Sequence, residues 1–310
     1  MKPPIQVALF GECMIELQGE AFGTMRQTFG GDTLNTAVYL ARSGASLGVR
    51  ARYATGLGDD RYSDEMLKRW QLEGVGVDLV RRLPGRVPGL YTISVDERGE
   101  RTFTYWRDRS AARSYFDEPD TPLERAAGSL DALYFSGISL AILNDNARER
   151  LFGAAQRVRA HGGRVIFDNN YRPRLWPDAA TAQTAYARAL ALSNVALVTL
   201  DDEQMLYGDA TLDASRARSL DAPCEEVVIK QGGGPVLVRI AGDVPFEVPV
   251  QCVHKVVDTT AAGDSFAGAY LAERLSGAEA AIAAAAGARL AAQVIQHRGA
   301  IIAPELLATT

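Results

Sequence analysis

Short strand-like runs alternate with longer amphipathic segments along most of this chain. The runs are rich in β-branched and aromatic residues and read QVALF, RARYAT, ALYFSGI, RVIFDNN, ALVTLDD and EVVIKQG. Helix-like patterns of apolar residues, for example over residues 146–163 and 181–194, lie between several of them. This alternation predicts an α/β protein whose mostly parallel sheet is covered by helices on both faces.

The carboxyl ends of the predicted strands are where function is expected. Ligands of such sheets bind beyond these ends, on one edge of the sheet. Polar or glycine-containing segments follow several of the runs there. These segments are residues 11–12, 137, 168–172, 201–203 and 230–234.

Two segments interrupt the alternation. Residues 13–31 are polar and strand-like, and residues 89–108 read as a hairpin with its turn at Arg98-Gly99. We expect both to form a small β-sheet lid, built from about 12–31 and about 87–113, within a single domain spanning 1–310. The alternative is a surface hairpin without a role, although Tyr105 and Arg107 on its second strand argue against that.

Size and charge limit the partners of the chain. Its 310 residues can form one large core with a small appendage. The net charge of −5, without any Lys/Arg block, argues against a nucleic-acid partner. The alanine-rich stretch 278–296 is interrupted by Glu279, Arg289 and Gln293. It therefore predicts a buried helix, and no membrane partner is expected.

The three cysteines point to a reducing compartment. Cys13, Cys224 and Cys252 are an odd number and form no CxxC motif. A disulfide framework or a thiolate metal site is therefore not expected. We expect all three to be small buried apolar residues and the protein to be cytoplasmic.

The stretch VVDTTAAGDSFAGAYLAERL places an aspartate at an expected anion site. The N–H groups of Ala261, Ala262 and Gly263 could converge on an anion at the start of a helix. A carboxylate beside a bound phosphate is unfavourable, so Asp264 needs a compensating role. It could accept the proton of a hydroxyl that attacks the phosphorus. It could instead simply cap the helix, and the local pattern leaves both hypotheses open.

Three other stretches carry weaker signals. Gly30-Gly31 lead into a helix that Asp32 or Thr33 can cap, and Asn35 adds an amide, although any tight turn would look similar. FDNNYRPRLWP sets arginines at a strand end, which suits a carboxylate or phosphate but also fits a solvated loop. EVVIKQGGGPVLVRI reads as a hairpin whose glycine turn could also lie against a nucleotide.

Several familiar signatures are missing from the sequence. It contains no GxxxxGK[ST] P-loop and no GxGxxG fingerprint. GDSFAG does not fit GxSxG, so Ser265 is not expected to be a hydrolase nucleophile. The three histidines show no spacing typical of metal ligands.

Two of these stretches together carry a family resemblance. DTTAAGDSFAGAYL and GGDTLNTAVYLARSG resemble the two halves of the signature of ribokinase-like, or PfkB-type, carbohydrate kinases. The resemblance covers nearly the whole chain. GECMIEL, GLYTISVDERGERTFTYWRD and VIFDNNYRPRLW further resemble the bacterial sugar-acid kinases of that family.

The resemblance implies a fold and an activity. The fold would be a ribokinase-like three-layer α/β/α sandwich with a small β-sheet lid. The activity would be transfer of the γ-phosphoryl group of ATP, with Mg²⁺, to the C6 hydroxyl of 2-dehydro-3-deoxy-D-gluconate. The alternatives are a fructokinase-like kinase of a neutral sugar and a non-catalytic sugar-acid sensor; a nucleoside kinase fits the arginines less well.

The resemblance also implies roles for individual residues. Asp264 would be the base, and Ala261, Ala262 and Gly263 the anion hole. The sugar acid would be held by Gly31, Asp32, Asn35, Tyr91, Tyr105, Arg107, Arg172 and Asp264. The nucleotide would be bordered by Asn170, Arg172, Lys230, Gly232, Gly233, Ala261, Gly263, Ala288 and Ala292.

Further expectations concern metals and assembly. Glu203 would help to place magnesium through water, although Leu200 stands where the family motif has asparagine. Ala261 stands where the commoner family string has glycine. A monovalent cation could bind near Asp258, and a homodimer or higher homo-oligomer would form through the lid, whose hairpin offers an exposed edge.

Overall fold

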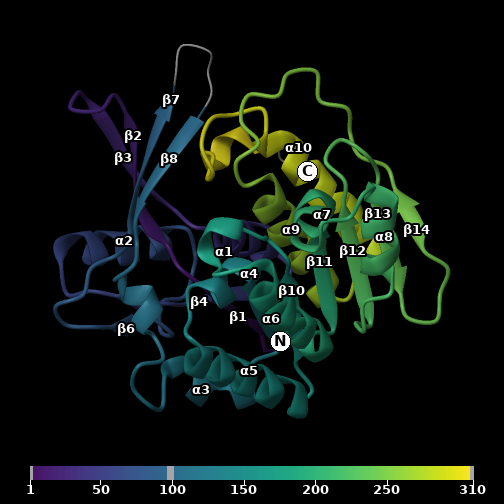
Figure 1. Cartoon of the computed structure of the whole chain (residues 1–310), viewed down its shortest axis with the longest axis horizontal. Helices are drawn as coiled ribbons and strands as arrows, with labels where there is room; N and C mark the ends of the chain where they lie inside the picture. The colour runs from purple at the N-terminus through teal and green to yellow at the C-terminus, as the bar shows by residue number, and fades with distance from the viewer. Residues whose placement is uncertain (1–2, 96–100, 308–310) are drawn as a thin grey trace.

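The computed structural model describes residues 3–95 and 101–307 (Figure 1). Its largest sheet has eight strands. The strand order is β14-β13-β12-β11-β10-β9-β1-β4. The six strands from β4 to β12 are parallel, and β13 and β14 are antiparallel, which confirms the predicted mostly parallel sheet. The strands are β1 (Ile5–Phe10), β4 (Val49–Ala54), β9 (Ala132–Ser136), β10 (Arg164–Asp168), β11 (Val195–Thr199), β12 (Glu226–Lys230), β13 (Val236–Ile240) and β14 (Phe246–Val248).

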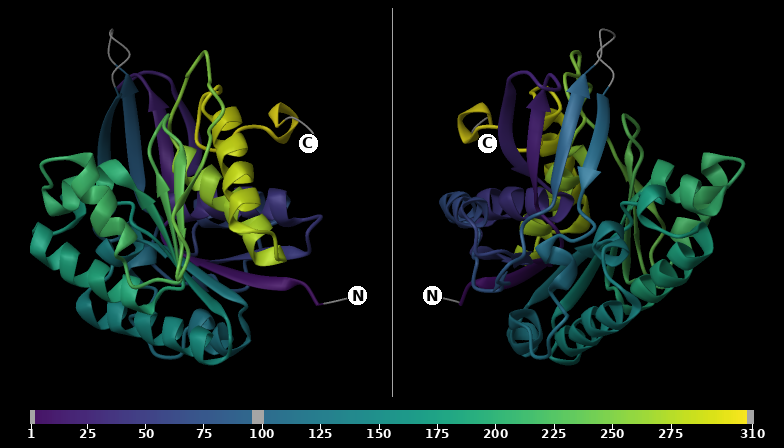
Figure 2. Two further views of the ribbon diagram at one scale, coloured as in Figure 1. Left: turned by 90° about the vertical axis from the view of Figure 1, so that its right-hand side faces the viewer. Right: turned by 60° about the vertical axis from the view of Figure 1, so that its left-hand side comes forward.

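Helices cover both faces of this sheet, so the molecule has the expected three layers (Figure 2). One face carries α1 (Asp32–Gly44), α9 (Ala262–Ser276) and α10 (Ala280–Val294), with α2 (Arg61–Leu72) beside them. The other face carries α3 (Pro122–Ala126), α4 (Gly137–Ala141), α5 (Asp145–Ala160), α6 (Ala179–Leu192), α7 (Leu200–Tyr207) and α8 (Leu212–Leu220). In the described part of the chain, short 3₁₀ helices lie at Ala111–Ser114, Ala127–Ser129, Pro173–Leu175 and Pro304–Leu306.

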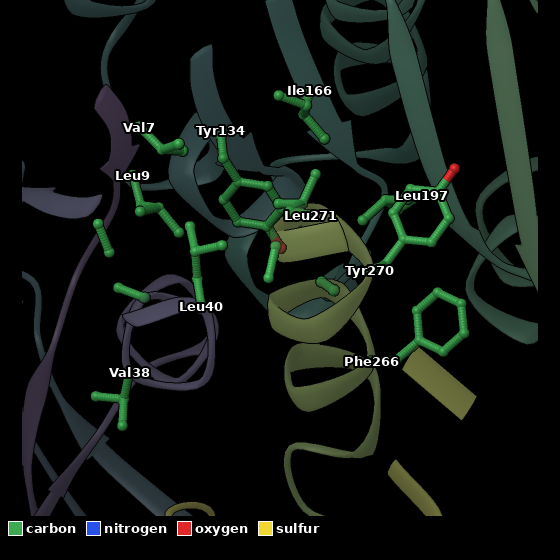
Figure 3. Close-up of a cluster of buried hydrophobic side chains, with 14 of the residues drawn as sticks. Val7, Leu9, Val38, Leu40, Tyr134, Ile166, Leu197, Phe266, Tyr270 and Leu271 are labelled. Atoms are coloured by element: carbon green, nitrogen blue, oxygen red, sulfur yellow. The ribbon is translucent and has the colours of Figure 1, made fainter. Parts of the chain in front are cut away.

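The alternation of side chains along each strand sorts the core into two halves. Val7 and Leu9 of β1 pack toward α1 and α9, whereas Ala8 and Phe10 pack toward the opposite helices. Figure 3 shows the first half, where Leu40 of α1 and Leu271 of α9 meet the strand side chains. The predicted buried alanine-rich helix is present as α10.

A second, smaller sheet has the strand order β3-β2-β7-β8. We call it the small sheet; it consists of β2 (Met14–Gly19), β3 (Met25–Gly30), β7 (Leu90–Val95) and β8 (Arg101–Trp106). The strands expected in both interrupting segments are therefore present. The turn expected at Arg98-Gly99 lies outside the described residues. A third sheet pairs β5 (Gly56–Leu57) with β6 (Arg81–Arg82).

Two sequence expectations about burial and membranes have clear outcomes. Cys13 and Cys224 are buried, but the expectation is wrong for Cys252, which is exposed. The reason is that Cys252 lies in the irregular segment between β14 and α9, not in a packed element. Among the helices of residues 3–95 and 101–307, none has the length and apolarity needed to span a bilayer.

Candidate active site

The start of α9 combines a left-handed residue with an aspartate. Ala261 has φ 61° and ψ 18°, and α9 begins at Ala262 in the right-handed conformation. This succession turns backbone N–H groups toward one side, and the first N–H groups of a helix lack intrahelical acceptors. The N–H of Ala262 already donates to the Thr259 carbonyl at 3.1 Å. The amides of Ala261 and Gly263 are thus the better candidates for an anion hole.

Asp264 is the third residue of α9 and is not its cap. The N-cap is Ala261, and no side chain in the described part of the chain caps this helix. The capping hypothesis is therefore wrong, because the carboxylate lies one turn too far along. It instead accepts a hydrogen bond from Nδ2 of Asn35 at 2.8 Å, across the contact between α1 and α9.

The surroundings of Asp264 favour its neutral form. Burial is the largest cause, and the negative charges of Asp32 and Asp168 add to it. The Asn35 hydrogen bond and the Lys230 charge act in the opposite direction. Burial and the two negative charges outweigh these two contacts, so the pKa of Asp264 is raised from 3.8 to about 7. A carboxylate with such a pKa can take up a proton at neutral pH, as a general base must.

Asp32 joins α1 to the strand ends. Its Oδ2 accepts hydrogen bonds from Ser136 Oγ at 2.5 Å and from Asn170 Nδ2 at 2.8 Å. The prediction that Asp32 or Thr33 caps α1 is wrong: the N-cap is Gly31, and within the described residues no side chain caps the helix. A Cβ on Gly31 would lie 2.1 Å from the Glu12 carbonyl oxygen, so this close approach requires glycine.

Lys230 and Asp168 form an ion pair at the same edge. The Nζ of Lys230 lies 3.0 Å from Oδ2 of Asp168, and only 11% and 5% of the two side chains are exposed. The same ammonium would lie 3.4 Å from a Cβ placed on Gly263. A largely buried cation is therefore next to the start of α9.

Of the other residues expected at the nucleotide, the two glycines are open and the two alanines are buried. Gly232 has φ 59°, and no described atom lies within 4 Å of a Cβ placed on Gly232 or Gly233. The glycine turn thus leaves backbone open to a ligand. Ala288 and Ala292 of α10 are both buried, and Ala288 packs into the core beneath α9.

Both arginines expected to meet a substrate carboxylate already pair with a carboxylate of the chain. Nη1 of Arg172 lies 3.0 Å and 3.1 Å from the two oxygens of Asp202, with about half of the arginine side chain exposed. Arg107 donates to Glu12, and both side chains are buried. This pairing places Arg107 at the root of the small sheet.

The two expected tyrosines stack on the small sheet. Their rings lie 5.7 Å apart with an interplanar angle of 30°. The hydroxyl of Tyr91 donates to Glu16 and is buried, whereas Tyr105 is 45% exposed. Of the pair, Tyr105 is the one available to a ligand.

Glu203 is the residue that the sequence predicts near a magnesium ion. No cluster of three His, Cys, Asp or Glu side chains suited to a metal occurs in residues 3–95 and 101–307. Glu203 is buried, with Asn169 Nδ2 and Arg218 Nε each 3.4 Å from its oxygens. Such a carboxylate can act on a metal through water, which is how magnesium commonly binds.

Sequence reasoning missed four polar residues of the site. They are Glu12, Glu16, Ser136 and Asp168. Glu12 and Asp168 do lie in segments singled out because they follow strands. That position was the available signal, but the sequence does not say which side chains pair across the edge.

Comparison with known proteins places this geometry in context. Residues 5–306 match the pfkB family of carbohydrate kinases. The 2-dehydro-3-deoxygluconokinase of Dickeya dadantii (strain 3937) is 48% identical over 304 residues, which are 97% of this chain and 98% of the relative. The enzyme of that name from Escherichia coli (strain K12) is 46% identical over 305 residues, covering 97% and 98%. A crystal structure of ribokinase II from E. coli with ATP and Mg²⁺ is 23% identical, with a TM-score of 0.81 over 96% of this chain and 94% of that one.

Proposed function

We propose, from the premise that this chain belongs to the pfkB family of carbohydrate kinases, that it is a kinase of 2-dehydro-3-deoxy-D-gluconate. It transfers the γ-phosphoryl group of ATP to the C6 hydroxyl and gives 2-dehydro-3-deoxy-6-phospho-D-gluconate. The relatives of that activity match nearly the whole chain, which favours this substrate over a neutral sugar. The single observation that carries the chemistry is the Asp264 carboxylate in the first turn of α9, held by the Asn35 amide at 2.8 Å.

Asp264 is the proposed base. Its carboxylate accepts the proton of the C6 hydroxyl as the oxygen attacks phosphorus. The amides of Ala261 and Gly263, together with the positive end of the helix dipole, stabilise the negative oxygens of the transferring group. Charge therefore develops where fixed donors already point, and no donor has to reorganise during the reaction.

Asn35 is the proposed contact for a sugar hydroxyl. Its Nδ2 is occupied by Asp264, while its buried Oδ1 has no hydrogen-bond partner among the described residues. A buried acceptor without a donor is costly, and a substrate hydroxyl would satisfy it. Gly31, which allows the close approach to the Glu12 carbonyl, and Asp32, which joins α1 to Ser136 and Asn170, would lie beside the same hydroxyl.

Arg107 and Arg172 are the proposed partners of the substrate carboxylate. A guanidinium has five donors, so one carboxylate of the chain does not exhaust it. Arg172 pairs through Nη1 alone in the contacts of the described residues and is half exposed. It is therefore the more accessible of the two. Tyr105 would line the same side of the substrate, with the buried Tyr91 stacked against it.

ATP with magnesium is the proposed phosphoryl donor. The nucleotide would lie along the glycine turn at Gly232 and Gly233, near Asn170, Lys230 and α10. Bound magnesium would neutralise the β- and γ-oxygens, and Glu203 would hold one of its waters. Metal ions that bridge the β- and γ-oxygens in this way recur in both P-loop enzymes and protein kinases.

The small sheet is the proposed lid and assembly surface. Closing it over the substrate would exclude water and so suppress ATP hydrolysis. We also propose that its exposed edge pairs two copies into a homodimer or a higher homo-oligomer. Light scattering should then give at least twice the mass of one chain. In the variant Trp106→Glu on β8, the measured mass should fall to that of a single chain.

Two further proposals concern ions and location. The Asp258 carboxylate accepts N–H bonds from Thr260 and Gly299, each at 2.9 Å, and so joins the loop before α9 to the segment after α10. A monovalent cation would bind at this junction, which predicts faster turnover in potassium chloride than in choline chloride. The protein would work in the cytoplasm, where cell fractionation should find it.

One observation favours the fructokinase-like alternative. Both candidate arginines are already paired with carboxylates of the chain, as they would be if the substrate were neutral. The test is an ADP-release assay with magnesium-ATP that compares the keto acid with fructose, ribose and adenosine. We expect strong preference for the keto acid. Preference for fructose would keep the chemistry of Asp264 and reject the substrate, while no turnover of any acceptor would support a sensor.

A further inference from the structure

We propose that the largely buried ion pair of Asp168 and Lys230 is part of the phosphoryl-transfer site. Asp168 is a positioning residue that holds the Lys230 ammonium at the start of α9, where the ammonium meets the transferring phosphoryl group. This inference rests on the proposed kinase function. It adds to that function a second source of charge stabilisation and a specific holder for it.

The sheet explains why these two residues can meet. Asp168 ends β10 and Lys230 ends β12, with β11 between them. Two strand spacings amount to roughly 10 Å, which only a long side chain can cross. Ile166 and Val228, two positions earlier on each strand, face the α9 side of the core. Both charged side chains therefore project to that side, and Lys230 reaches across to give the 3.0 Å contact.

Asp168 is itself held in place. Besides Lys230, the hydroxyl of Tyr134 donates to its Oδ2 at 3.3 Å, and Thr36 Oγ1 of α1 lies 3.4 Å from that hydroxyl. All of these side chains except Lys230 are at most 5% exposed. The carboxylate is thus a fixed anchor for an ammonium that would otherwise have four freely rotating bonds.

The ammonium is next to the candidate anion hole. It would lie 3.4 Å from a Cβ on Gly263, so any larger residue there would crowd it. Phosphate oxygens bound by the amide of Gly263 would be within reach of the same cation. A preorganised cation at this place stabilises the charge that develops on the transferring group.

The pair also acts on Asp264. Asp168 disfavours the ionised form of Asp264 and Lys230 favours it. Removing the Asp168 charge should therefore lower the pKa of Asp264, and removing the Lys230 charge should raise it. The titratable and charged groups that act on Asp264, or on which its charge acts, are Asp32, Tyr39, Tyr134, Asp168, Arg172 and Lys230.

The test compares pH profiles of kcat/KM for the keto acid at saturating magnesium-ATP. In Asp168→Asn the acid limb should move to lower pH by about one unit, because a nearby negative charge is lost. In Lys230→Met it should move to higher pH, and kcat at the plateau should fall by about 100-fold because a charge-stabilising donor is lost. Lys230→Arg should recover most of that loss.

Two controls match the charge changes. Lys68→Met on the exposed face of α2 and Asp243→Asn in an exposed loop change the net charge equally but lie outside the pair. Both should keep the wild-type profile. Circular dichroism identifies any variant that fails to fold. If Lys230→Met does not fold, Lys230→Arg is compared with the wild type in its place.

The outcomes separate this inference from the proposed function. If the wild type does not phosphorylate the keto acid, the function itself fails. If the wild type is active but Asp168→Asn and Lys230→Met shift the acid limb in the same direction or not at all, the inference is overturned. Wild-type kcat in Lys230→Met would also overturn it.

Discussion

At the scale of single residues, the position proposed for the base Asp264 lowers the stability of the fold when its carboxylate is ionised. Its native pKa of about 7 lies above the ordinary value of 3.8, so the folded protein binds this proton more tightly than the unfolded chain. Its contribution to stability is therefore lost as pH rises from about 4 to about 7. Keeping an ionised base at this place destabilises the fold at neutral and alkaline pH.

Asp264→Asn should remove that penalty. We expect the free energy of unfolding in urea to be higher than that of the wild type at pH 8, where the wild-type carboxylate is ionised. The difference should shrink at pH 5.5, where the wild-type carboxylate is mostly protonated. An equal difference at both pH values would contradict the assigned pKa.

Ala261 is strained for an alanine. The left-handed conformation costs an L-residue other than glycine about 1 kcal/mol or more. Ala261→Gly should therefore raise the free energy of unfolding by about 0.5–1 kcal/mol, with kcat within about threefold of the wild type. The control is Ala262→Gly in the first turn of α9, which should lower it by a similar amount. If Ala261→Gly lowered the free energy of unfolding as much as the control does, Ala261 would not be strained.

The sequence allowed some residues of the site to be predicted and not others. Asp264 was identified because a carboxylate at an expected phosphate site calls for an explanation. Asp168 and Lys230 both lie in segments singled out because they follow strands, but the pairing of the two side chains was not predicted. Partners on strands separated by a third strand depend on register and side-chain reach, which are tertiary properties that no local pattern encodes.

At the scale of elements, the close contact of α1 with α9 sets the geometry of the site. Gly268 lets the two helices approach: a Cβ there would lie 2.6 Å from Cβ of Tyr39 and 2.8 Å from the backbone N of Leu40. The hydrogen bond from Asn35 to Asp264 crosses the same contact. Base and sugar contact are therefore positioned by one helix pair.

Gly268→Ala should separate the two helices. We expect the free energy of unfolding to fall by about 2 kcal/mol and kcat to fall with it, because Asn35 moves away from Asp264. The control is Gly153→Ala inside α5, where no described atom lies within 4 Å of the added Cβ. That change should raise stability by about 0.5–1 kcal/mol. Similar losses at both glycines would show that packing of α1 on α9 is not the cause.

The elements themselves were largely predictable, but their caps were not. The spacing of apolar residues predicted the strands and the helices α5, α6 and α10, because each of these elements buries at least one face. Asp32 and Asp264 resemble capping residues, yet both helices start at backbone positions without a side-chain cap. Their carboxylates instead serve contacts between elements, which outweigh the local preference.

At the scale of the whole molecule, the small sheet is tied to the main domain by a buried ion pair. Glu12 follows β1 and Arg107 follows β8, so the pair lies where the chain enters and leaves the small sheet. Glu12 Oε1 and Arg107 Nε are buried without hydrogen-bond partners among the described residues. The pair therefore retains unused hydrogen-bonding capacity at the root of the proposed lid.

Arg107→Ala should raise the KM for the keto acid at least tenfold more than the KM for ATP. The variant also leaves Glu12 buried and unpaired, which lowers stability. Partial unfolding reduces kcat without changing KM, so the ratio of the two KM values isolates binding. Arg26→Ala on exposed β3 is the control and should change neither value. Equal changes of both KM values in Arg107→Ala would remove this residue from the substrate site.

The most direct test of the whole account is the turnover of Asp264→Asn beside its affinity for the keto acid. We predict that kcat with saturating magnesium-ATP falls by about 100- to 10,000-fold, because the base is lost. The Kd of the keto acid, measured by calorimetry, should stay within about threefold, because the amide has nearly the shape of the carboxylate. A variant that keeps near-normal kcat would contradict the account, since the attacking hydroxyl would then be activated elsewhere.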